Sequence, residues 1–163
     1  MKKMKLFSKK FVAIFLVMAT LTLGVVPTMA DTTPNFTLLG HVEKRGTAGL
    51  NSIDGEVTIG TVGKALRLEA IQVNGLDVQI NAHVQNLGWM GWKTQTAGTE
   101  GKALRLEAIR IKLTGDLAEN YDIYYRVHVQ KIGWMDWAKN GETTGTVGQA
   151  LRVEALEIKL VEK

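Results

Sequence analysis

The chain has no cysteine, and its 163 residues include only 2 prolines. Without disulfides, a folded domain must be held together by its apolar core alone. Beyond the first thirty residues, no apolar run approaches the roughly 20 residues that a membrane-spanning helix requires. The same region also lacks sustained 3.6-residue periodicity, so a helical bundle is excluded. These absences leave a β-rich domain with a substantial core and no transmembrane span.

Positive charge is concentrated at one end of the chain. The whole sequence has 20 Lys+Arg and 16 Asp+Glu, but five of the lysines and no acid lie in the first ten residues. An apolar stretch follows at 11–26, and Thr28 and Ala30 place small residues before a cleavage point. We therefore expect residues 1–30 to be a secretory signal peptide that is cleaved after Ala30.

The remaining residues, 31–163, are close to neutral once the signal peptide is set aside. Nucleic-acid binding requires a basic field on the folded domain, so nucleic acid is not an expected partner. We expect a secreted, extracellular protein, either released or held at the cell surface by what it binds.

One segment occurs three times. The copies read GTVGKALRLEAIQV at 60–73, GTEGKALRLEAIRI at 98–111 and GTVGQALRVEALEI at 145–158. A similarity that recurs every 40–50 residues indicates a repeat architecture. We therefore predict one domain over 31–163, built from three repeats: 36–74, 78–113 and 123–160.

Each repeat combines two kinds of strand. The first shows period-two alternation, as in 78–84, and ends at a turn with Gly-Trp. The second changes the parity of its apolar residues at the same position in every copy, as at Ala108, which predicts either a β-bulge or a strand that passes from one core layer to another. We expect an all-β fold with pseudo-threefold symmetry, β-prism-like, with a β-trefoil-like arrangement as the alternative.

The pattern His-Val-Gln-x-x-Gly-Trp-x-x-Trp followed by Gly-Thr-x-Gly-x-x-Leu-Arg-Leu-Glu-Ala-Ile-x-Ile resembles the clostridial hydrophobic repeat with a conserved tryptophan (ChW). The match covers 83–113 and 128–160, and 41–73 in its second half; Thr47 and Leu50 stand where tryptophans are expected. The resemblance implies an extracellular bacterial module, often present in threes, that binds glycans or proteins at the cell surface.

Four tryptophans are the candidate site residues. In an extended chain, residues three apart face opposite ways, so each Gly-Trp-x-x-Trp segment can place one indole inward and one outward. We expect Trp89 and Trp134 to pack in the core. Trp92 and Trp137 adjoin a loop of variable length and are the predicted ligand-binding residues, with Trp89 and Trp134 less favoured.

The other repeated polar residues have structural interpretations. His41, His83 and His128 occupy one strand position but have no second ligand nearby, so no metal site and no cofactor are predicted. The Arg-x-Glu pairs, such as Arg105 and Glu107, are expected to be ion pairs rather than a glycosidase dyad. The sequence thus predicts a non-catalytic module for cell-wall or surface polysaccharide, including peptidoglycan. The alternative is a protein–protein adaptor that assembles surface proteins.

Overall fold

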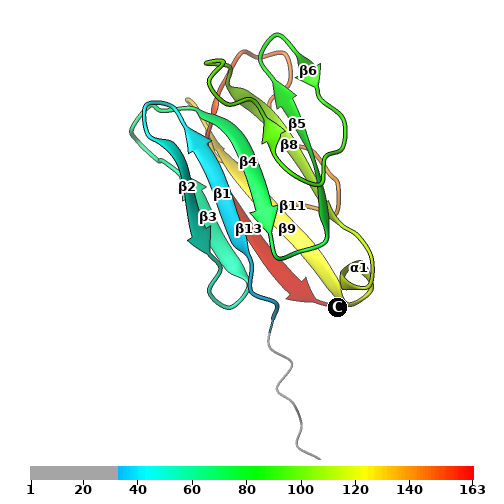
Figure 1. Ribbon diagram of the computed structural model, residues 1–163. Helices are drawn as coiled ribbons and strands as arrows, with labels where there is room; N and C mark the ends of the chain where they lie inside the picture. Colours follow the sequence, from blue (N-terminus) through cyan, green and yellow to red (C-terminus); the bar gives the residue numbers. More distant parts are fainter. Residues whose placement is uncertain (1–32) are drawn as a thin grey trace, which may run out of the picture. The chain divides into compact units, whose positions relative to one another are not determined.

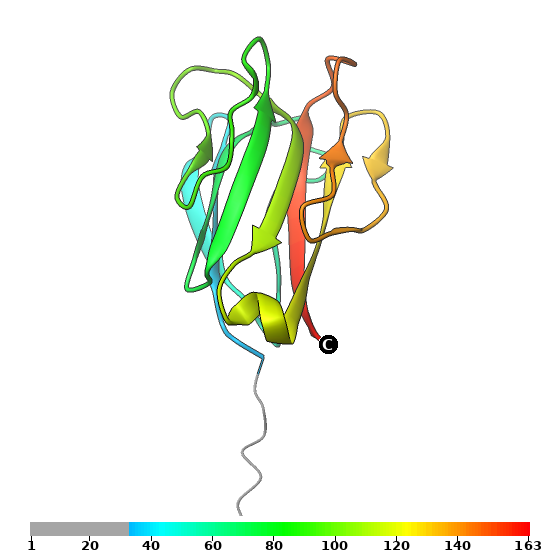
Figure 2. The ribbon, with the colours of Figure 1, turned by 90° about the vertical axis from the view of Figure 1, so that its right-hand side faces the viewer.

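The structure, a computed structural model, describes residues 33–163, and the predicted signal peptide lies outside them. Within these residues nearly all regular structure is β, arranged as three antiparallel sheets (Figure 1). A single helical turn, α1 (Leu117–Asn120), connects two of the sheets (Figure 2). The prediction of an all-β fold built from three repeats is confirmed.

Each sheet is centred on the two long strands of one repeat. Sheet A, in the order β2-β1-β4-β7, contains β1 (Thr37–Val42), β2 (Gly46–Asn51), β4 (Leu68–Asn74) and β7 (Ala97–Gly98). Sheet C, in the order β12-β8-β5-β6, contains β5 (Val78–Val84), β6 (Gly88–Trp89), β8 (Leu106–Leu113) and β12 (Thr144–Gly145). Sheet B, in the order β10-β9-β13-β3 with β11 also beside β9, contains β3 (Glu56–Gly60), β9 (Tyr121–Val129), β10 (Gly133–Trp134), β11 (Ala138–Lys139) and β13 (Val153–Glu162).

Every sheet takes one edge strand from another repeat. Strand β7 of repeat 2 pairs with β4, β12 of repeat 3 pairs with β8, and β3 of repeat 1 pairs with β13. The exchange is cyclic, so each repeat both gives and receives a strand. Among the described strands no pairing closes a barrel. Three open sheets agree with the β-prism-like prediction and not with the trefoil-like alternative.

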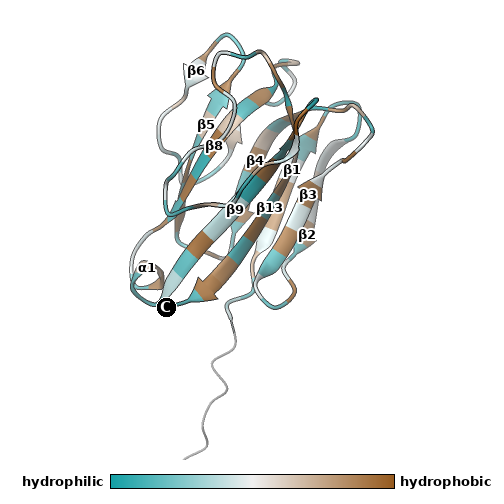
Figure 3. Ribbon diagram, turned by 180° about the vertical axis from the view of Figure 1, so that it is seen from behind, coloured by the Kyte–Doolittle hydropathy of each residue, from teal (hydrophilic) through white to brown (hydrophobic). Residues whose placement is uncertain are grey.

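The apolar sides of the three sheets contribute to one core. Along β9, buried and partly exposed residues alternate strictly. Apolar and polar residues are interspersed along the long strands (Figure 3). Ile123, Tyr125 and Val127 from this strand are fully buried and join core residues from the other two sheets. Burial raises the pKa of Tyr125 to about 12, and its hydroxyl donates a hydrogen bond to the Glu142 carbonyl. The polar side chains of the long strands lie on the opposite side of each sheet, away from the core.

The predicted β-bulge is present in all three repeats. In sheet A, His41 is opposite Ala70 but Val42 is opposite Leu68, so Glu69 is the extra residue. The same shift makes Glu107 and Glu154 the extra residues in the other sheets. The bulge lets apolar residues on both sides of it face the core.

Each bulged glutamate also anchors the strand that arrives from another repeat. Its backbone carbonyl accepts the N–H of the threonine in the Gly-Thr motif. The three bonds are Thr99 to Glu69 at 2.9 Å, Thr146 to Glu107 at 2.8 Å and Thr61 to Glu154 at 2.9 Å. The tripled segment is therefore explained by the fold, since one half of it forms the bulge and the other half docks on a bulge.

Candidate functional site

The Gly-Trp segments form short edge strands, β6 in sheet C and β10 in sheet B. In sheet C, Trp89 lies opposite His83, and the two rings meet edge to face with centroids 5.3 Å apart. In sheet B, Trp134 lies opposite His128 in the same arrangement at 5.5 Å. The conserved spacing between histidine and tryptophan within the repeats thus produces a cross-strand aromatic pair.

The second tryptophan of each segment lies in another bulge, on the segment that pairs with the long strand. The N–H of Met90 bonds to the Ala82 carbonyl, and Lys93 exchanges two hydrogen bonds with Ile80. Two residues, Gly91 and Trp92, therefore lie opposite the single residue between Ala82 and Ile80. Repeat 3 places Trp137 in the same way on sheet B. Both indoles thus belong to the outer faces of their sheets.

All four indoles lie beneath cationic side chains. On sheet C the pairs are Arg110 with Trp89 at 4.2 Å and Lys112 with Trp92 at 4.4 Å, measured to the ring centroid. On sheet B they are Arg126 with Trp134 at 5.1 Å, Arg126 with Trp137 at 4.5 Å and Lys159 with Trp137 at 4.0 Å. Such cation–π contacts are worth about 0.5–1 kcal/mol at exposed positions.

These cations were not identified as site residues from the sequence. A signal was present, because Lys112 and Lys159 occupy one position of the repeat and Asn74 occupies it in repeat 1. The lysine therefore accompanies the tryptophans, and it is missing where they are missing.

The prediction that Trp89 and Trp134 pack in the core is wrong. Trp134 is 36% exposed, Trp89 is half-buried, and neither contributes to the core. The reason is that β6 and β10 pair through the positions of the outward histidines, so their tryptophans face outward too. Trp92 is 39% exposed and Trp137 is half-buried. All four tryptophans, rather than one per repeat, therefore line the outer faces.

Replacing Trp134 by Ala is expected to lower the free energy of unfolding by only about 1–2 kcal/mol, because a partly exposed ring loses less burial than a core side chain. As a reference, Ile158→Ala removes a fully buried side chain and should cost about 2–5 kcal/mol. Urea denaturation of both variants measures the difference. A larger loss in Trp134→Ala than in Ile158→Ala would mean that the indole is part of the core.

Repeat 1 has the same framework without the aromatic surface. Thr47 lies opposite His41, where the other sheets have Trp89 and Trp134, and its Oγ1 is 2.9 Å from the His41 Nδ1. Leu50 replaces the second tryptophan and is 51% exposed. The outer face of sheet A thus offers no flat ring.

The histidines do not converge on a common point, since each lies beside the bulged glutamate of its own sheet. The His–Glu distances are 3.7 Å for His41–Glu69, 3.1 Å for His83–Glu107 and 3.1 Å for His128–Glu154. At 3.1 Å the ring nitrogen and the carboxylate oxygen are close but lack the alignment of a hydrogen bond. Among residues 33–163, no group of three or more His, Asp or Glu residues is placed to hold a metal ion.

The Arg-x-Glu pairs are ion pairs. Arg67, Arg105 and Arg152 each donate from Nε to the glutamate two residues on, at 2.7, 3.0 and 2.9 Å. The three glutamates are buried. Burial of a carboxylate is unfavourable unless cationic or hydrogen-bonding partners compensate for the lost water, and the arginines do so here. Each sheet thus has a triad, made up of its histidine, its arginine and its bulged glutamate. Because repeat 1 keeps this triad without any tryptophan, the triads are structural.

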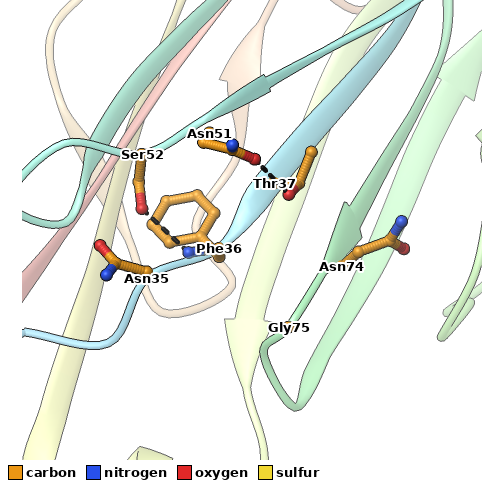
Figure 4. A pocket seen from close by; sticks show the side chains of 7 residues that line it. All are labelled: Asn35, Phe36, Thr37, Asn51, Ser52, Asn74 and Gly75. Atoms are coloured by element: carbon orange, nitrogen blue, oxygen red, sulfur yellow. Dashed lines mark hydrogen bonds between the residues drawn. The ribbon is translucent and has the colours of Figure 1, made fainter.

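A separate open pocket of about 540 Å³ lies in repeat 1, at the end where the described chain begins (Figure 4). Asn35 and Asn74 flank it on opposite sides of Phe36. Several of its polar groups already bond within the protein: the Phe36 N–H donates to Ser52 Oγ at 2.9 Å and Thr37 Oγ1 donates to Asn51 at 2.7 Å. None of its lining residues belongs to repeats 2 and 3, so the pocket and the tryptophans are distinct features. We assign the candidate site to the tryptophan faces.

Comparison with known proteins gives one result. A family model described as Clostridial hydrophobic W (ChW) matches three times, at residues 46–75, 83–115 and 128–162. No curated protein and no solved structure matches the chain. In the part of the chain that the structure describes, no helix is long and apolar enough to cross a membrane. Because the three matched segments make up more than half of the sequence and coincide with its three repeats, the chain belongs to the clostridial hydrophobic W family.

Proposed function

We propose that this protein is a secreted, non-catalytic module that binds saccharides of the bacterial cell surface through the outer faces of sheets C and B. ChW repeats are found in extracellular or cell-surface proteins, which is in keeping with a binding role there. The observation that carries the proposal is the placement of all four tryptophans on these two faces, partly exposed and outside the core.

A saccharide fits this surface chemically. Pyranose rings have apolar C–H faces that stack on indoles, and their hydroxyls need polar partners at the ring edge. On sheet C the amide side chains of Gln79 and Asn81 project to the same side as Trp92, because they alternate with core residues along β5. The triad glutamates are occupied by arginines, which supports binding without bond cleavage.

The test is a binding isotherm to purified cell-wall polysaccharide. Trp92→Ala and Trp137→Ala should each weaken binding roughly tenfold, since one stacked ring contributes on the order of 1–1.5 kcal/mol. Leu50→Ala is the matched control, because Leu50 is the exposed residue at the same position of repeat 1. Equal losses in all three variants, or no loss in any, would contradict the proposal.

One observation favours the alternative, an adaptor that binds surface proteins. Four apolar side chains in turns and bends are about half exposed: Val62, Leu87, Ile132 and Val147. Exposed apolar side chains are typical of protein-binding surfaces when they form a contiguous patch. Protease treatment of the cell walls separates the two functions, because saccharide binding survives it and binding to surface proteins does not.

A further inference from the structure

Sheets C and B carry the same aromatic pair but differ in charge. On the central strand of sheet C, Arg110 and Lys112 project outward two residues apart. The corresponding residues of sheet B are Glu157 and Lys159. One position of the repeat is therefore an arginine in one sheet and a glutamate in the other.

The two cations of sheet C lack acidic partners. Among the described residues, neither Arg110 nor Lys112 forms an ion pair with a carboxylate. The Arg110 Nε donates to Thr143 Oγ1 at 2.7 Å, and the guanidinium otherwise lies over Trp89. The Lys112 ammonium lies over Trp92. Both cationic groups thus contact only neutral side chains in these interactions, and their charges are not compensated by an ion pair within residues 33–163.

A third residue of this face has an unused polar atom. Asn81 on β5 lies opposite Arg110 on the neighbouring strand β8. On the other side of β5 it lies opposite the bulge formed by Gly91 and Trp92. It is only 6% exposed, yet its Oδ1 has no hydrogen-bond partner among the described residues. A buried acceptor without a partner is unfavourable, so a ligand donor that reached it would stabilise the complex.

The arginine on this face of sheet B is paired internally. Arg126, which replaces Asn81, pairs with Glu157 at 2.5 Å. The pKa of Glu56 is raised by a hydrogen bond to Glu157 and by burial. The guanidinium near Trp134 and Trp137 therefore has a carboxylate partner, whereas in the described part of the chain neither cation near Trp89 and Trp92 has one.

We propose that the outer face of sheet C, formed by Asn81, Trp89, Trp92, Arg110 and Lys112, binds saccharides that carry an anionic group, a carboxylate or a phosphate. Arginine and lysine form charge-assisted hydrogen bonds to such groups, and arginine does so in a bidentate manner. The indoles and the buried amide would contact the sugar ring. This inference rests on the proposed function and adds to it a ligand class and a difference between the two faces.

Two pairs of probes test the anionic group itself. Oligogalacturonate is compared with its methyl-esterified form, and phosphomannan with dephosphorylated mannan, using residues 31–163 in low salt. At least one acidic probe should bind about tenfold more tightly than its neutral counterpart. The preference should fall steeply with added salt, because the charges that create it are partly exposed.

Substitutions assign the preference to sheet C. Arg110→Gln should abolish most of the preference, measured as the ratio of acidic-probe to neutral-probe affinity within each variant, and Arg110→Glu, which introduces the residue of sheet B, should abolish it completely. Arg110→Lys keeps the charge and should retain part of the preference. Lys44→Gln removes an exposed lysine from a turn of repeat 1 and is the charge-matched control. Thermal melting of each variant verifies that it is folded.

The inference is overturned if no acidic probe is preferred, or if the preference survives in folded Arg110→Gln and Arg110→Glu. It is also overturned if poly-L-glutamate binds as tightly as the acidic saccharides with the same dependence on Arg110, because the surface would then select acidic chains without regard to a sugar. The proposed function fails separately, when Trp92→Ala and Trp137→Ala leave binding to cell-wall polysaccharide unchanged.

Discussion

A chain that ends at Leu113 is expected to be unfolded, with no cooperative transition in heat or denaturant. The reason is the cyclic exchange of edge strands. Removing repeat 3 takes away β9 and β13, and with them the partner of β3 and the edge strand β12 of sheet C. The core also loses large buried side chains such as Tyr125, Ile123 and Ile158. Two sheets with open edges and an incomplete core cannot offset the chain entropy of folding.

The measurement compares residues 31–113 with residues 31–163 by far-ultraviolet circular dichroism and urea denaturation. The longer chain should unfold in a single transition, and the shorter one should show a coil spectrum or aggregate through its exposed strand edges. A sigmoidal, reversible transition in the shorter chain would show that two repeats fold on their own. The exchange of strands would then be an accessory feature instead of a requirement.

The bulge could be predicted from the sequence because its signal is local and repeated. Alternation with period two is interrupted at one position in every copy, and three identical interruptions have a common structural cause. The structure adds why the glutamate occupies that position. Glu107 is the extra residue of the bulge, and its carboxylate pairs with Arg105 and lies close to His83. Its backbone carbonyl accepts a hydrogen bond from the N–H of Thr146 in the next repeat.

The exchange of edge strands could not be predicted. Strands β7 and β12 are two residues long, too short for any periodic pattern, and their partners are 26–37 residues away in other repeats. The outward position of Trp89 and Trp134 was missed for a related reason. Burial of a large aromatic residue depends on which residue it pairs with across the strand, and this pairing is a property of the register.

Repeat 1 separates residues that build the fold from residues that serve a ligand. It keeps the histidine and the Arg-x-Glu pair, which have partners within their own sheet, and the Gly-Thr motif, which docks on another sheet. It lacks both tryptophans and the lysine over the second one. The residues that vary together between repeats are thus the same ones that form the outer faces of sheets C and B, which is why we place ligand binding there.

A large effect on stability is also expected at the glycines that dock one repeat on another. Gly98 has φ +110°, and a Cβ added there would lie 2.3 Å from the Glu69 carbonyl oxygen and 2.7 Å from the Ala70 Cα. Both atoms belong to a backbone fixed by the bulge, so neither is free to move aside. Positive φ costs alanine about 1–2 kcal/mol and overpacking adds about 1–3 kcal/mol. Gly98→Ala should therefore lower the free energy of unfolding by about 2–5 kcal/mol, measured by urea denaturation.

Gly101→Ala in the same Gly-Thr-x-Gly segment is the matched control. Its φ is +67°, but a Cβ there would meet nothing within 4 Å, so only the backbone term of about 1–2 kcal/mol applies. The difference between the two variants isolates the contact between the Gly-Thr motif and the bulge. Gly60→Ala and Gly145→Ala should resemble Gly98→Ala, because their added Cβ atoms would lie 2.4 Å from the carbonyl oxygens of Glu154 and Glu107. Equal, small losses at positions 98 and 101 would mean that the repeats are held together mainly by the shared core, and that the docking of Gly-Thr on the bulge contributes little.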